Sequence, residues 1–100
     1  MNDNMNLIEI ANKYHTSVMR GLRILLREVA KQADKSCFPF PAMINTDNEC
    51  DVVVDIIDIR QDGNDVTIEY IQNNEKREDC IELFSYDELY SILCNLCKRL

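Results

Sequence analysis

Apolar residues recur every three or four positions over the first third of the chain, which is the spacing of one helix face. The series is Leu7, Ala11, Tyr14, Val18, Leu22, Leu25, Val29 and Ala33. It predicts one long helix within residues 1–35. A helix over residues 7–33 would be about 40 Å long, whereas a domain of this size has a radius of gyration of only about 13 Å. The surplus apolar length therefore predicts a partner surface, most simply a second copy in a homodimer.

Two features of this segment are typical of a helix break. Short hydroxyl side chains at Thr16 and Ser17 can cap a new helix, and Gly21 costs about 1 kcal/mol relative to alanine. Neither feature forces the helix to end. We predict the unbroken form, with a break near His15 as the alternative.

The segment from Asp51 to Gln72 contains two runs rich in valine and isoleucine, separated by Asp62-Gly63-Asn64. Branched residues favour strands and this turn sequence supplies left-handed backbone angles, so the segment predicts a β-hairpin. The apolar face of the first run shifts after Ile56, which indicates a β-bulge. Residues 36–50 contain both prolines and predict an irregular connection, in which Ala42 to Asn45 could be extended.

The last third of the chain predicts one strand and one helix. A polar connection, Asn73 to Asp79, is followed by alternating apolar residues over Cys80 to Phe84, which predict a third strand. Ser85 and Glu88 form a capping box that opens the final helix. The predicted fold is one α+β two-layer domain, residues 1–100, with a long N-terminal helix (1–35), an irregular connection (36–50), a three-stranded antiparallel meander (51–84) and a C-terminal helix (85–100).

The chain is acidic, and its charged residues are unevenly distributed along the sequence. Its 11 Lys and Arg against 18 Asp and Glu give a net charge of −7. Residues 1–35 hold six basic and four acidic residues (+2), and residues 36–100 hold five and fourteen (−9). This field disfavours indiscriminate nucleic-acid binding and suits another protein as partner, a basic one in particular. Asp55, Asp58 and Glu69 on the hairpin are the candidate partner-binding residues.

No stretch of the sequence has the length and apolar character of a membrane span, and the N-terminus lacks the pattern of a secretion leader. We therefore expect a cytoplasmic protein that does not bind membranes. The five cysteines are then expected to be reduced thiols and small core residues.

The sequence predicts no catalytic, metal or cofactor site. His15 is the only histidine, and no nucleophile with a base and no phosphate loop is present. Residues 58–69 match part of the spacing of a calcium loop, but Arg60 would occupy position 3 of the loop, where an oxygen ligand is needed. Cys94 and Cys97 form a C-x-x-C pair without the second pair that a zinc site needs.

An alternative function depends on a basic stripe along the predicted N-terminal helix. Arg20, Arg23, Arg27 and Lys31 recur on one face and could contact phosphates. With a turn over residues 15–17, this segment resembles a helix-turn-helix. The order of elements also resembles that of secretion chaperones and immunity proteins, without a shared motif. The sequence thus predicts a non-enzymatic acidic protein-interaction module, acting as an adaptor, chaperone or inhibitor, with nucleic-acid binding as the alternative.

Overall fold

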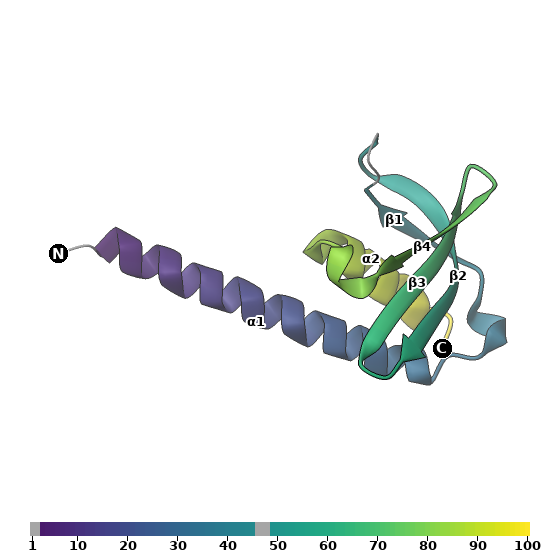
Figure 1. Cartoon of the computed structure of the whole chain (residues 1–100), viewed down its shortest axis with the longest axis horizontal. Coiled ribbons are helices and arrows are strands. Elements are labelled where there is room, and N and C mark those ends of the chain that lie inside the picture. Colours follow the sequence, from purple (N-terminus) through teal and green to yellow (C-terminus); the bar gives the residue numbers. More distant parts are fainter. Residues whose placement is uncertain (1–2, 46–48) are drawn as a thin grey trace.

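The computed structural model describes the backbone of residues 3–45 and 49–100, and the side chains of these ranges from Glu9 onward. Within these ranges, two α-helices and four antiparallel strands make up an α+β fold, which agrees with the predicted class (Figure 1). The elements are α1 (Asp3–Lys31), a 3-10 turn (Lys35–Cys37), β1 (Phe40–Ile44), β2 (Val52–Asp62), β3 (Asp65–Gln72), β4 (Glu75–Cys80), a second 3-10 turn (Ile81–Leu83) and α2 (Tyr86–Cys97).

The predicted hairpin forms the centre of the sheet, whose strand order is β1-β2-β3-β4. Gly63 has a φ of 60°, a left-handed value that suits glycine at the turn between β2 and β3. The register of these strands shifts between Ile56 and Asp58, which confirms the predicted bulge. The bulge keeps Ile56 and Ile59 both on the buried face of β2.

The prediction of three strands is wrong, because the sheet has four. The segment predicted as a polar connection is mostly β4, and the predicted third strand is instead the 3-10 turn Ile81–Leu83. β4 reads Glu-Lys-Arg-Glu-Asp-Cys and has no apolar face, because it is an edge strand whose charged side chains remain in water. The extended piece expected at Ala42 to Asn45 is β1, which begins two residues earlier at Phe40.

The helix α2 covers one face of the sheet and also the outer edge of β1. The capping box predicted at its start is confirmed, because Ser85 and Glu88 exchange side-chain and backbone hydrogen bonds. Glu88 also accepts the Asn45 backbone N–H through Oε2 at 2.8 Å, and the Ser91 hydroxyl accepts the Met43 N–H at 2.9 Å. These contacts satisfy backbone donors at the edge of β1 and so protect that edge from pairing with another strand.

The helix α1 runs unbroken for 29 residues, or about 44 Å. Within it, the Thr16 hydroxyl donates a hydrogen bond to the Asn12 carbonyl. Residues 15–17 are helical, so the turn required by a helix-turn-helix is absent there. That resemblance is therefore wrong. Among the described side chains of α1, from Glu9 onward, every residue from 9 to 18 is exposed, and the buried ones that pack on the domain are Met19 and Leu26. Figure 1 shows this exposed part projecting beyond the sheet and α2, in a molecule measuring 55 × 31 × 25 Å.

No helix in the described ranges combines the length and the apolar character needed to span a membrane.

Candidate functional site

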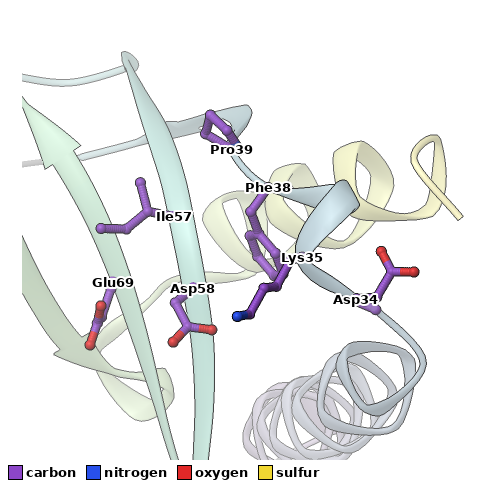
Figure 2. A pocket seen from close by; sticks show the side chains of 8 residues that line it. Asp34, Lys35, Phe38, Pro39, Ile57, Asp58 and Glu69 are labelled. Atoms are coloured by element: carbon purple, nitrogen blue, oxygen red, sulfur yellow. The ribbon is translucent and has the colours of Figure 1, made fainter.

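An open groove of about 690 Å³ lies beside the second half of β2 (Figure 2). The pairing of β1 with β2 begins at Phe40 and Ile56, so β2 continues beyond this point without β1 beside it. The connection from α1 to β1 passes on this side and forms the opposite wall. The groove is lined by Ala33, Asp34, Lys35, Phe38, Pro39, Ile57, Asp58 and Glu69.

The wall formed by the connection is shaped by the 3-10 turn Lys35–Cys37. Asp34 caps this turn, because its carboxylate accepts hydrogen bonds from the Ser36 backbone N–H at 2.9 Å and from the Ser36 hydroxyl. These hydrogen bonds hold the pKa of Asp34 below its usual value, so this carboxylate is charged at neutral pH. Buried Cys37 fixes the turn to the domain, and Phe38 follows it into the groove.

The wall formed by β2 presents Ile57 and Asp58, the two residues at the bulge. Asp58 accepts the Ile59 backbone N–H through Oδ1 at 2.9 Å. Figure 2 shows Lys35 directing its amine toward the Asp58 carboxylate, yet in the described part of the chain Asp58 has no ion pair within 4 Å. The groove thus combines an apolar lining from Phe38 and Ile57 with a carboxylate that forms no close ion pair with any described residue.

The three acidic residues predicted on the hairpin have different environments. Asp55 is exposed and does not line the groove, whereas Asp58 and Glu69 line it. Glu69 is only 7% exposed and forms ion pairs with Arg60 Nε at 2.9 Å and Lys76 Nζ at 3.4 Å. Its negative charge is therefore compensated by neighbouring strands, and Asp58 is the one residue of the three that is both in the groove and unpaired with a cation.

Sequence reasoning did not find the contribution of Asp34, Lys35 and Phe38. The aromatic and apolar residues of the connection signalled that it packs on the domain, but nothing in the sequence indicated that it returns beside β2. The bulge near Ile56 could have drawn attention to Ile57 and Asp58, because bulges often redirect side chains at functional sites.

The basic stripe lies on one face of α1 as predicted, but its four cations are not equally available. Arg20 is exposed, whereas Arg23 and Arg27 are half-buried and line a cavity of about 60 Å³ at the tip of the β2–β3 hairpin. Lys31 pairs with Glu28 at 3.2 Å. Within the described ranges, Arg20 is thus the one fully exposed member of the stripe without an ion pair, which is little positive charge for contacts along a phosphate backbone.

The prediction that the cysteines are small core residues is wrong for four of the five, because only Cys37 is buried. Cys94 is half-buried, and the other three are exposed. In the part of the chain that the structure describes, no group of three or more His, Cys, Asp or Glu side chains is arranged to hold a metal ion.

No family model matches this chain, and neither the curated proteins nor the solved structures include a match to it.

Proposed function

We propose that this α+β domain is a non-enzymatic protein-interaction module, which binds a segment of another protein in the groove beside β2. The bound segment carries a large apolar side chain next to a lysine or arginine. The observation that supports this function is the groove itself, in which Phe38 and Ile57 form an apolar lining beside the carboxylate of Asp58. Such a combination suits an apolar anchor with an adjacent cation.

The strength of such binding follows from two unequal contributions. Burying one large apolar side chain is worth about 1.5–3 kcal/mol, whereas an ion pair at a solvated rim adds only about 0.2–1 kcal/mol. The apolar contact would therefore supply most of the affinity, and Asp58 would select a basic partner. The charge of −9 on residues 36–100 would accelerate association with such a partner at low salt.

Lys35 competes with the cation of the partner in this proposal, because its amine is directed toward Asp58 (Figure 2). Its removal would leave Asp58 freer to accept a ligand. Substitutions at Lys35 and Asp58 are thus expected to change affinity in opposite directions, although both lie in the same groove. Opposite changes in affinity would distinguish recognition of the partner's charge from a general disturbance of the groove, which would weaken binding in both variants.

A selection from a displayed library of random peptides tests this function. The wild-type chain is expected to enrich peptides that contain Lys or Arg beside a large apolar residue. One enriched peptide is then titrated against three variants by fluorescence anisotropy. Asp58→Asn should weaken binding severalfold, Lys35→Met should strengthen it, and Asp55→Asn, which lies outside the groove, should change it little. Failure to enrich such peptides, or equal binding by all three variants, would exclude the proposal.

Nucleic-acid binding through the basic stripe is the alternative function, and the same titration on random duplex DNA distinguishes it. Duplex binding that is lost in Arg20→Ala, with no enriched peptide, would favour the alternative. Adaptor, chaperone-like and inhibitory roles all remain consistent with peptide binding, and the partner obtained from a selected peptide motif would separate them. The proposal retains the cytoplasmic location expected from the sequence, which imaging of a tagged chain in its host would test.

A further inference from the structure

Four large apolar side chains of α1 are exposed on a face of the helix that the domain leaves uncovered. These are Ile10, Tyr14, Val18 and Leu25, with exposed fractions of 48, 70, 48 and 50%, whereas Ile24 lies toward the domain, where it lines the small cavity with Arg23 and Arg27. The buried residues Met19 and Leu26 follow Val18 and Leu25 by one position, which is a rotation of about 100° around the helix. We call the exposed side of α1 the free face, because it is distinct from the side that packs on the domain.

The free face has the seven-residue repeat of a coiled-coil seam. Steps of three and four alternate along the series Ala11, Tyr14, Val18, Gly21 and Leu25. At Gly21 the helix surface is open, because an added Cβ would meet no atom within 4 Å. A seam with this repeat is complemented by a helix with the same repeat, and a second copy of the chain always provides one.

We propose that two copies of the chain pair through the free faces of α1, in antiparallel orientation, with the two-fold axis crossing the seam midway between Tyr14 and Val18. In this register Tyr14 of one copy lies opposite Val18 of the second copy, and Ala11 lies opposite Gly21. A large residue then meets a medium one and two small residues meet each other, so the seam has nearly uniform width. A parallel pair would instead place tyrosine opposite tyrosine and glycine opposite glycine.

The distribution of charge favours the same orientation. Residues 36–100 carry −9 and residues 1–35 carry +2. An antiparallel pair places the two acidic bodies at opposite ends, with the weakly basic helices between them, whereas a parallel pair places the bodies side by side. The part of α1 that projects beyond the domain provides the room for the second helix (Figure 1).

The size of the free face indicates a dimer of moderate strength. Covering these four side chains, together with Ala11 and Gly21, on each copy corresponds to an interface of about 1,000 Å², at the lower end of the range for specific complexes. We expect dissociation in the micromolar range, where a few seam contacts decide the affinity. The seam residues lie outside the groove beside β2, so the dimer and peptide binding are tested independently.

Sedimentation equilibrium on the full chain tests the seam. At concentrations of tens of micromolar, the wild-type chain should approach twice its monomer mass of 11.7 kDa, because an interface of this size gives a dissociation constant in the micromolar range. Val18→Asp should raise the dissociation constant at least tenfold, because it places a carboxylate in the seam. Thr16→Asp adds the same charge on the opposite side of α1 and is the matched control, with circular dichroism confirming that both variants retain their helices. A wild-type monomer at every concentration, or a dimer that Val18→Asp leaves intact, would overturn the seam.

The orientation is tested by restoring the dimer with a second charge. In the antiparallel pair, Tyr14→Lys combined with Val18→Asp places each lysine opposite an aspartate of the other copy, so the double variant should regain most of the dimerisation lost in Val18→Asp. In a parallel pair the same variant places like charges together and restores nothing, which would overturn the antiparallel arrangement. A wild-type monomer that instead binds the helix of a different protein through Val18 would overturn the assignment of the second copy.

Discussion

Replacement of Glu88 tests whether one carboxylate joins the start of α2 to the end of β1. Glu88 is 7% exposed, and its two oxygens accept the backbone N–H groups of Ser85 and Asn45, both at 2.8 Å. Hydrogen bonds to a charged group are worth about 1.5–3 kcal/mol each. Because Ser85 and Asn45 are exposed and water can replace part of each bond, we expect Glu88→Ala to cost about 2–4 kcal/mol.

Two further variants give this prediction its controls. Glu88→Gln keeps one carbonyl acceptor but turns an amide toward the other N–H, so it should cost about 1–2 kcal/mol. Ser85→Ala removes only the hydroxyl that accepts the Glu88 N–H at the long distance of 3.4 Å, and should cost less than about 1 kcal/mol.

Urea unfolding followed by far-ultraviolet circular dichroism measures these changes, at one protein concentration and neutral pH. The expected order of stability is wild type, Ser85→Ala, Glu88→Gln and Glu88→Ala, with similar denaturant slopes. If Ser85→Ala destabilises the protein as much as Glu88→Ala, the helix cap alone accounts for the stability. The bond from Glu88 to β1 would then contribute nothing.

Two further predictions concern the core and the response to alkali. Leu26 is fully buried, so Leu26→Ala should cost about 2–5 kcal/mol in urea unfolding, whereas Leu25→Ala on the free face should leave the monomer almost unchanged. Tyr70 donates to Asp79 at 2.6 Å, and burial together with this hydrogen bond raises its pKa to about 12 from an ordinary value of 10. Because the pKa is raised in the folded state, Tyr70 contributes its full stabilisation below pH 10, and this contribution is lost as the pH rises toward 12. The free energy of unfolding of the wild type should therefore fall by about 2–3 kcal/mol over this interval. Tyr70→Phe should lack that loss, and equal pH profiles would contradict the prediction.

The missed strand shows where periodicity ceases to be informative. β4 is charged on both faces, so neither alternation nor hydrophobicity marks it. A turn signal was nevertheless present, because Asn73 and Asn74 both have positive φ values, 53° and 66°, and asparagine is frequent in such hairpin turns. The alternating apolar residues that suggested a strand after it belong to a 3-10 turn, in which Ile81 is buried and Leu83 is exposed.

Glu69 illustrates the same limit at the candidate site. It alternates along β3 with Ile68 and Tyr70 and so lies on the opposite face of the strand. Its burial and ion pairs depend on Arg60 from β2 and Lys76 from β4, which reach it only in the register set by the bulge and by a strand that the sequence did not reveal. Charge that appears free along the sequence is therefore compensated in the sheet.

The features determined by the sequence alone are those stabilised by neighbouring residues. The unbroken α1, the turn at Gly63, the bulge and the capping box at Ser85 each depend on backbone preferences or on side chains a few positions apart. The tertiary structure decided how distant segments meet: the return of the connection beside β2, the second bond of Glu88 to β1, and how much of α1 the domain covers. These outcomes depend on contacts between residues far apart in the chain, whose register and distance no local pattern encodes.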